Sequence, residues 1–249
     1  MSSKPDTDAP KRRKRAPAKK VAPAPAPSAL RMWLRLFARL SVGAIAALLA
    51  LIVLFTVINP PTTPYQLSER WRLSGVEQEW RSLEEISPYM ARSVIAAEDA
   101  NYCLHWGFDM SAIRAALAEG QGRGASTISQ QTVKNVFLWQ GRSWVRKALE
   151  AGITPVAELV WTKRRMIEIY LNVAEFGRGV FGAEAAAQHY YGVPAKDLTA
   201  TQAARLAALL PSPKRWSPDD THVRKRAAQI IDGAATIEAD GRAACLGEL

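Results

Sequence analysis

Glu98 is the first residue of this chain whose type and position could move a proton. It follows Val94 by four residues and Ile95 by three, so on a helix it projects from the same apolar stripe. A carboxylate on such a face is either buried beside hydrophobic side chains or exposed in a cleft, and burial would raise its pKa and suit it to general base catalysis. Taken alone, the residue is more simply explained as a stripe-edge glutamate paired with Arg92 or another base.

Further polar side chains follow at the same helix end. Asp99, Tyr102 and His105 lie within seven residues of Glu98. A single histidine in such a place is more often a hydrogen-bonded structural residue than a catalyst. The group is therefore a candidate site that needs support from elsewhere in the chain.

A second group surrounds the predicted start of another helix. Small residues lead through Ser126 to residues 127–130, Thr-Ile-Ser-Gln, which have the pattern of a capping box. The free N–H groups of a helix start suit an anion, and Thr127, Gln131 and Lys134 share one helical face at i, i+4 and i+7. A hydroxyl, an amide and an ammonium in a row would suit a phosphate or a sugar. An ordinary capped helix with a solvated polar face is the alternative.

A third group consists of Arg146, Lys147 and Glu150, which lie within about one helical turn of each other. A solvated set of ion pairs, worth about 0.2–0.5 kcal/mol each, is the simpler explanation. The stronger hypothesis is a second carboxylate in a cleft, whose neighbouring cations hold a polyanion. Lys163 and the two arginines after it extend that positive potential.

The elements that would position these groups are mostly helices. Start signals, apolar stripes and stop signals predict helices over residues 87–98, 109–120, 127–137, 144–161, 163–176 and 199–211. Gly177, Gly179 and Gly182 predict a loop before an alanine-rich segment that reaches Tyr191. No run alternates with period two, so the expected fold class is mainly α.

Composition and charge exclude several classes of protein. The 249 residues carry a net charge of +10, but residues 1–39 hold eleven Lys and Arg against two Asp, which leaves only +1 for the rest. We therefore expect no nucleic-acid partner. Two cysteines exclude a disulfide-rich scaffold, and the sequence leaves open whether Cys103 and Cys245 pair or remain free.

An apolar segment indicates a membrane anchor. Residues 40–58 contain no charge, and nineteen helical residues would be about 28 Å long, close to the thickness of a bilayer core. The alternative is a cleaved signal peptide, whose apolar region would be shorter and followed by a small-residue cleavage site. The predicted organisation is a disordered basic cytoplasmic tail (1–39), a transmembrane helix (40–58), a connector with one short strand (59–79) and a folded domain on the other side of the membrane (80–249).

Together and in this order, the groups resemble the motifs of the peptidoglycan glycosyltransferase family. The matching stretches are VIAAEDANYCLHWG, GASTISQQTVKNVFLW, RSWVRKALE, KRRMIEIYLNVAEFGRGVFGAEAAAQHYYG and the run to LLPSPKRWSP. The likeness covers roughly residues 80–218, and the 31 residues after Pro218 are too few for a penicillin-binding transpeptidase domain. It implies a monofunctional member with a lysozyme-like, mainly helical fold and a small membrane-proximal lobe.

The family polymerises lipid II, and the resemblance implies a role for each glutamate. Glu98 would deprotonate the acceptor sugar hydroxyl, which attacks the anomeric carbon with inversion and releases undecaprenyl pyrophosphate. Glu150 matches the second essential glutamate, which assists departure of the pyrophosphate or orients the donor. The substrate-binding residues that we expect are Asp99, Tyr102, His105, Ser126, Thr127, Gln131, Lys134, Asn135, Arg146, Lys147 and Lys163.

The resemblance also implies partners and a cofactor. Lipid II, the growing glycan strand and the membrane are the expected partners, and other cell-wall synthesis proteins are candidates. A divalent cation, Mg²⁺ or Mn²⁺, assists many members of the family, although no metal-ligand signature in this sequence predicts it. Phe137, Leu138 and Trp139 would belong either to the lobe that enters the lipid or to the core.

Three positions depart from the family pattern. Tyr102 stands where phenylalanine is usual, Ala125 replaces the second glycine of the usual Gly-Gly-Ser-Thr, and Cys103 is unusual so near the two acidic residues. None of the three removes a catalytic group. Two other functions remain open from sequence alone, namely a lytic enzyme that cleaves glycans with two glutamates and a membrane-tethered scaffold that only binds glycan.

Overall fold

The computed structural model describes residues 29–119 and 126–247. The chain divides into two compact units, with the boundary between Ala47 and Leu48. Most of the predicted basic tail, residues 1–28, lies outside the described residues, and so does Ala125.

Helix α1, Ala29–Leu54, carries the apolar segment. It begins earlier than predicted and includes Arg31, Arg35 and Arg39, while residues 55–58 form turns rather than its last helical turn. Within the described part of the chain, α1 is the helix that is long and apolar enough to cross a membrane, judged by length and composition.

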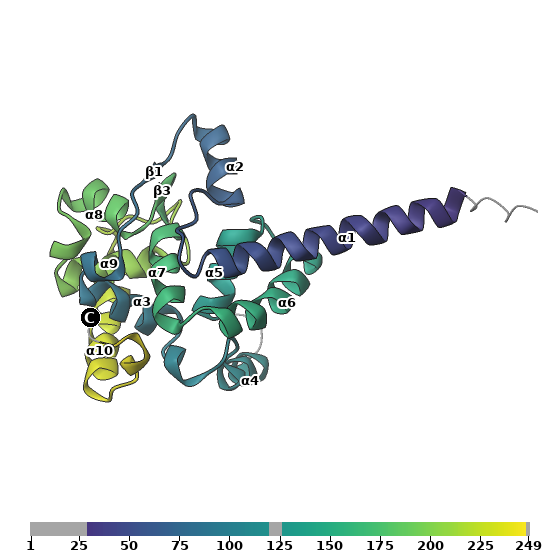
Figure 1. Cartoon of the computed structure of the whole chain (residues 1–249). Coiled ribbons are helices and arrows are strands. Elements are labelled where there is room, and N and C mark those ends of the chain that lie inside the picture. Colours follow the sequence, from purple (N-terminus) through teal and green to yellow (C-terminus); the bar gives the residue numbers. More distant parts are fainter. Residues whose placement is uncertain (1–28, 120–125, 248–249) are drawn as a thin grey trace, which may run out of the picture. The chain divides into compact units, whose positions relative to one another are not determined.

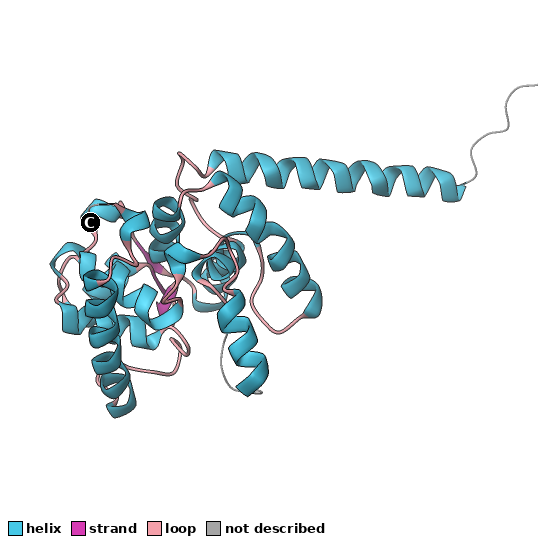
Figure 2. Cartoon of the chain, turned by 90° about the horizontal axis from the view of Figure 1, so that it is seen from below, coloured by secondary structure: helices cyan, strands magenta, loops and turns pink. Residues whose placement is uncertain are grey.

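The second unit is mainly helical, which confirms the predicted fold class (Figures 1 and 2). Its described α-helices are α2 Pro64–Leu73, α3 Pro88–Glu98, α4 Met110–Glu119, α5 Ile128–Phe137, α6 Trp144–Val160, α7 Lys163–Val173, α8 Ala183–Tyr191, α9 Ala200–Leu209 and α10 Thr221–Ala239. Three short strands, β1 Glu77–Gln78, β2 Glu175–Gly177 and β3 Val180–Phe181, form a sheet in the order β1-β3-β2. β3 is parallel to β1 and antiparallel to β2.

Local capping explains why several helices begin where the sequence predicts. The Thr127 hydroxyl accepts from the backbone N–H of Gln130, whose side-chain oxygen accepts from the N–H of Thr127, so α5 opens with the predicted capping box. Thr199 and Gln202 do the same for α9. The carboxylate of Asp109 accepts from the first N–H groups of α4.

Two predictions about elements were wrong. The helix predicted to reach residue 176 ends at Val173, because Glu175 and Gly177 pair with β3 across a turn in which Gly179 has φ +79°. The segment that contains Gly177, Gly179 and Gly182 therefore includes the paired strands β2 and β3, and it is not a simple loop. The connector also contains α2, which starts with its own capping box at Thr63.

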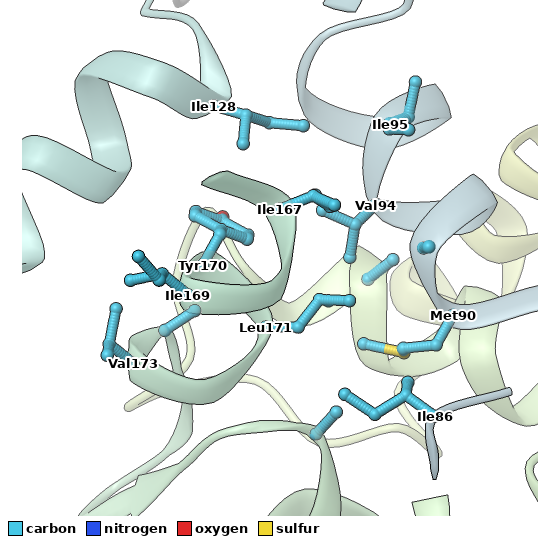
Figure 3. Close-up of a cluster of buried hydrophobic side chains, with 14 of the residues drawn as sticks. Ile86, Met90, Val94, Ile95, Ile128, Ile167, Ile169, Tyr170, Leu171 and Val173 are labelled. Carbon is cyan, nitrogen blue, oxygen red and sulfur yellow. The ribbon is translucent and has the colours of Figure 1, made fainter. Parts of the chain in front are cut away.

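The core that positions the site lies around α7. Its buried side chains meet apolar residues of α3 and α5, as Figure 3 shows. Elsewhere α3, α9 and α10 pack against one another, and α5 packs against both α6 and α7. The labelled members of the cluster are Ile86, Met90, Val94, Ile95, Ile128, Ile167, Ile169, Tyr170, Leu171 and Val173.

A disulfide joins Cys103 to Cys245, with their Cα atoms 5.6 Å apart. Cys103 lies in the 3-10 helix η2 (Tyr102–Leu104), just after α3, and Cys245 lies in η4 (Ala244–Leu246) near the end of the described chain. The structure thus selects one of the two alternatives that the sequence left open, and it ties the segment beside Glu98 to the C-terminal turn.

Candidate active site

The carboxylate of Glu98 ends α3 and faces two polar neighbours. Its Oε2 accepts a 2.8 Å hydrogen bond from Gln131 Nε2 on α5, and its Oε1 lies 3.6 Å from Arg226 Nη2 on α10. Of the bases that the sequence offered as partners of Glu98, Arg92 pairs with Glu238, and Arg226 is the one that lies beside Glu98. Burial raises the pKa of Glu98, although the Gln131 hydrogen bond and the charge of Arg226 act in the opposite direction.

The orientation of the Gln131 amide is fixed from its other side. Its Oε1 accepts a 3.1 Å hydrogen bond from the hydroxyl of Tyr170 on α7. Burial raises the pKa of Tyr170 well above its usual value, so the phenol stays protonated and remains a donor. The amide N–H group is consequently directed at Glu98.

Asp99 connects three segments rather than standing free. One carboxylate oxygen lies 2.8 Å from His105 Nε2, and the other accepts a 3.0 Å hydrogen bond from the backbone N–H of Ile128 at the start of α5. Asp99 therefore fixes the end of α3 against α5, and His105 supports it.

Glu150 lies on α6 and is almost fully buried, with 2% of its surface exposed. Arg146 Nη1 lies 2.6 Å from its Oε2, and Lys147 Nζ donates to its Oε1. Lys147 also donates to the hydroxyl of Ser126 at 3.0 Å. The ion pairs are those that the helical spacing predicts, but their shared carboxylate is buried, while the Lys147 side chain is 40% exposed.

Lys134 on α5 lies within electrostatic range of both glutamates. Burial lowers the pKa of its ammonium, while the negative charges of Glu150 and Glu98 act in the opposite direction. Across the described segments, no carboxylate oxygen lies within the 4 Å of an ion pair from its Nζ. A buried cation between two carboxylates, without a direct ion pair, is a candidate for binding an anionic substrate group.

Two cavities surround these residues. The first, about 540 Å³, is lined by Gln131, Lys134 and Asn135 of α5, by Tyr170, and by the loop after α9. The second, about 650 Å³, is lined by Glu98, Asp99, Ser126, Thr127 and Arg226, among others. Gln131 and Pro211 line both cavities, so the two share a wall.

Some of the predicted site residues lie together at the two cavities, and others line neither cavity. Glu98, Gln131 and Lys134 form one group at the two cavities. Glu150, Arg146 and Lys147 line neither cavity wall and connect to the second cavity through Ser126. The Thr127 hydroxyl also donates a 2.7 Å hydrogen bond to the carbonyl oxygen of Gly107. The hydroxyl is therefore largely occupied by hydrogen bonds within the protein.

Two of the predicted substrate-binding side chains line neither cavity. The Tyr102 side chain is fully buried, and its hydroxyl donates to the carbonyl oxygen of Lys163 at 2.9 Å rather than pointing into a cavity. The ammonium of Lys163 lies 2.7 Å from Glu158 Oε1 and lines neither cavity. Both side chains belong to a buried polar group beside α6, because Glu158 provides the negative charge that sequence spacing alone did not reveal.

The aromatic run after α5 also divides between core and surface. Leu138 is buried, and Phe137 stacks on Phe55 and Trp161 with ring centroids 6.0 and 5.9 Å apart. Trp139 remains 46% exposed, and Trp144 at the start of α6 is 91% exposed. Of the predicted run, Leu138 and Phe137 therefore pack in the core, and Trp139 lies at the surface.

Sequence reasoning missed several residues that line the cavities. Arg226 comes from α10 and reaches Glu98, while Tyr65, Glu175 and Lys214 line the first cavity from α2, β2 and the loop after α9. No local spacing joins these residues to Glu98. Only the packing of distant elements brings them to the site.

Comparison with known proteins gives a consistent result. The family model described as Transglycosylase matches residues 65–235. A biosynthetic peptidoglycan transglycosylase of Jannaschia sp. (strain CCS1) is 62% identical over 220 residues, which cover 87% of this chain and 90% of that protein. Proteins of the same name are 45% identical in Rhodospirillum centenum (86% of this chain, 95% of that protein) and 50% identical in Yersinia pestis strain Pestoides F (70% and 78%).

Proposed function

Because this chain belongs to the transglycosylase family, it is a peptidoglycan glycosyltransferase, and we propose that Glu98 is its general base. Its reaction joins disaccharide units of lipid II into glycan strands, with inversion at the anomeric carbon and release of undecaprenyl pyrophosphate. The observation that carries the proposal is the carboxylate of Glu98, whose side chain is 14% exposed and lines the second cavity beside the Gln131 amide.

The proton transfer follows from that environment. A sugar hydroxyl is a poor nucleophile near neutral pH, and a carboxylate with a raised pKa accepts its proton as the new bond forms. The hydroxyl oxygen then attacks the anomeric carbon of the donor, and the bond between that carbon and the pyrophosphate oxygen breaks. The electron pair leaves with the lipid pyrophosphate, while the proton stays on Glu98.

Cations near the first cavity suit the departing pyrophosphate. Lys134 lines that cavity, and Arg146 and Lys147, which pair with Glu150, lie within electrostatic range of Lys134. Preorganised positive charge in a site shielded from water stabilises developing negative charge strongly. We assign Glu150 to holding Arg146 and Lys147 in place, which agrees with a role in leaving-group departure.

The side chains fit a resident metal ion poorly. No group of three His, Cys, Asp or Glu side chains in residues 29–119 and 126–247 could hold one. Asp99 is occupied by His105 and Ile128, and Glu150 by two cations. We therefore derive no step through Mg²⁺ or Mn²⁺, and the assay below is run with and without either ion.

The family and the apolar helix α1 indicate a membrane-associated enzyme. We propose that α1 spans the inner membrane once, with the basic tail in the cytoplasm and the second unit in the periplasm. Positive residues favour the cytoplasmic side, and Arg31, Arg35 and Arg39 all lie towards the N-terminal end of α1. The Cys103–Cys245 disulfide supports an oxidising compartment for the second unit.

The test is polymerisation of lipid II by the full chain in detergent or vesicles. Replacing a general base costs about 10²–10⁴-fold in rate, so we expect Glu98→Gln to lose that much strand synthesis, and Glu150→Gln to be strongly impaired. Glu238→Gln is the matched control, because Glu238 is exposed and pairs with Arg92 away from both cavities. Near wild-type polymerisation by Glu98→Gln would remove Glu98 from the role of base.

The same assay separates the two other functions. A lytic enzyme would shorten purified glycan strands and make none from lipid II. A scaffold would show no polymerisation even as the wild type, so Glu98→Gln would change nothing.

A further inference from the structure

A charged cluster outside the catalytic residues connects three elements at the first cavity. It consists of Tyr65, Glu69 and Arg72 on α2, Glu175 on β2 and Lys214 on the loop between α9 and α10. We call it the Lys214 cluster. Neither the sequence motifs nor the proposed reaction gives it a role.

Lys214 lies at the centre of this cluster. Its Nζ is 2.8 Å from Glu69 Oε1, 3.6 Å from Glu175 Oε2 and 5.2 Å from the centroid of the Tyr65 ring. The ammonium itself reaches the surface, but the side chains of Glu69 and Glu175 are only 8% and 3% exposed. Two nearly buried carboxylates therefore hold one lysine.

Each carboxylate has a second hydrogen-bond partner. Glu175 accepts from the Tyr65 hydroxyl and from the backbone N–H of Gly179, and Glu69 accepts from Arg72. Burial alone would raise the pKa of Glu69, but the hydrogen bonds from Arg72 and Lys214 outweigh it and lower that pKa. With two cations and two anions the cluster is balanced, so removal of Lys214 leaves buried negative charge uncompensated.

The loop that carries Lys214 forms part of the site. Residues 210–215 line the first cavity, and Pro211 lines the second cavity as well. Within the described residues, the other hydrogen bonds of residues 210–217 stay between α9, the loop itself and Asp220 at the start of α10. The Lys214 cluster thus provides the polar connection from this shared wall to the rest of the second unit.

We infer that Glu69 and Glu175 are positioning residues that act through Lys214 to hold the wall shared by the two cavities. The inference rests on the proposed function, because a fixed wall matters only if a substrate binds against it. The paired ammonium is a structural support rather than a free anion site. Release of the loop therefore weakens substrate binding before it affects proton transfer at Glu98.

The kinetic test compares variants of the full chain on lipid II. We expect Lys214→Met and Glu175→Gln each to raise KM about tenfold, with kcat changed by less than about threefold, because positioning of the substrate is lost. The double variant should be no worse than the poorer single one, because both changes break the same contact. Lys214→Arg should recover most of the wild-type KM, and the exposed Lys196→Met serves as the matched control.

A second readout follows the loop without any turnover. Trypsin cleaves after Arg215, and we expect Glu175→Gln to increase the rate of that cleavage about tenfold, since cleavage tracks the population of the opened loop. Glu69→Gln gives the same test from α2 if Glu175→Gln folds poorly. Lys196→Met should be cleaved at the wild-type rate.

Unchanged KM together with an unchanged rate of cleavage after Arg215 would overturn the inference. A fall in thermal midpoint and kcat with an unchanged KM would overturn it as well, because that result marks a merely structural role. If the wild type makes no glycan, the proposed function fails, and the tryptic cleavage still decides whether the cluster holds the loop.

Discussion

At the scale of single residues, the surroundings of Glu98 act on its pKa in opposite directions. Burial favours its neutral form, while the Gln131 amide and the positive charges of Arg226 and Lys134 favour its carboxylate. The result is a raised pKa in a group that still has partners for its charge. A base in this state accepts a proton more readily than an exposed glutamate, yet it remains mostly deprotonated above its pKa.

This balance predicts the acid side of the pH profile. A base must be deprotonated, so kcat/KM should fall as the pH drops through the raised pKa of Glu98. Gln131→Leu removes the hydrogen bond that lowers this pKa, so the pKa should rise further and the acid limb should move to higher pH. The measurement is kcat/KM for lipid II between pH 4 and pH 9, values chosen to bracket about 4.3, the usual pKa of glutamate.

Gln188→Leu, on the exposed side of α8, is the control and should keep the wild-type limb. An acid limb that moves to lower pH in Gln131→Leu would contradict the assignment of the limb to Glu98. A uniform loss of rate at every pH would give Gln131 a role in substrate binding alone.

At the scale of elements, α5 connects the two cavities. Its first turn meets Asp99 and Gly107, and its next two turns carry Gln131 and Lys134 to the cavity walls. The start of α5 therefore sets the positions of the side chains that face the substrate.

Thr127→Ala tests this dependence. Loss of the cap costs about 1 kcal/mol, and a buried carbonyl of Gly107 without its donor costs about 1–3 kcal/mol more, so we expect a clear fall in unfolding free energy and in activity. Thr127→Ser keeps the hydroxyl and should lose much less. Equal destabilisation of the two variants in chemical denaturation would show that the methyl group, rather than the hydroxyl, stabilises α5.

Elements differ in how much the sequence could predict. The start of α5 was predictable because Thr127 and Gln130 are three residues apart and cap each other. The end of α7 was not, because residues 174–176 contain no glycine or proline to stop the helix, and only the pairing of β2 with β3 shows that Glu175–Gly177 is a strand. The length of α1 was also underestimated, since arginines flanking an apolar run can still be helical.

In the candidate site, too, local sequence patterns predict some features, and contacts between distant segments determine the others. The burial of Glu98 follows from its apolar stripe, and the Glu150 ion pairs follow from helical spacing. Arg226 and Lys214 reach the cavities from the C-terminal part of the chain, and no local pattern indicates which carboxylates they meet. Tyr102 looked like a cavity residue because it lies next to the acidic pair, but the 3-10 helix η2 turns it into the core.

At the scale of the whole molecule, the disulfide joins positions 142 residues apart. It fixes the segment between α3 and α4 to the C-terminal turn, whose Leu246 is buried and accepts a hydrogen bond from Arg164 through its carbonyl oxygen. A crosslink over so long a loop restricts the unfolded chain strongly, by about 2–4 kcal/mol.

Reduction of the disulfide should therefore lower the thermal midpoint of the wild type. The thermal midpoint of the double variant Cys103→Ser/Cys245→Ser should not change on reduction. We expect dithiothreitol to lower the thermal midpoint of the wild type to that of the double variant, with the same change in polymerising activity. Thiol titration of the denatured protein, before and after reduction, counts the cysteines. Two free thiols in the unreduced protein would contradict the disulfide.

The position of Cys245 also sets an order for the maturation of the enzyme. Ribosomes synthesise a chain from its N-terminal side, so a protein held by α1 and exported as proposed would bring Cys245 across the membrane only after helices α4 to α10. The segment next to Glu98 would therefore be crosslinked only after those helices had emerged. A chain that stalled before Cys245 had crossed would lack the disulfide and its contribution to stability.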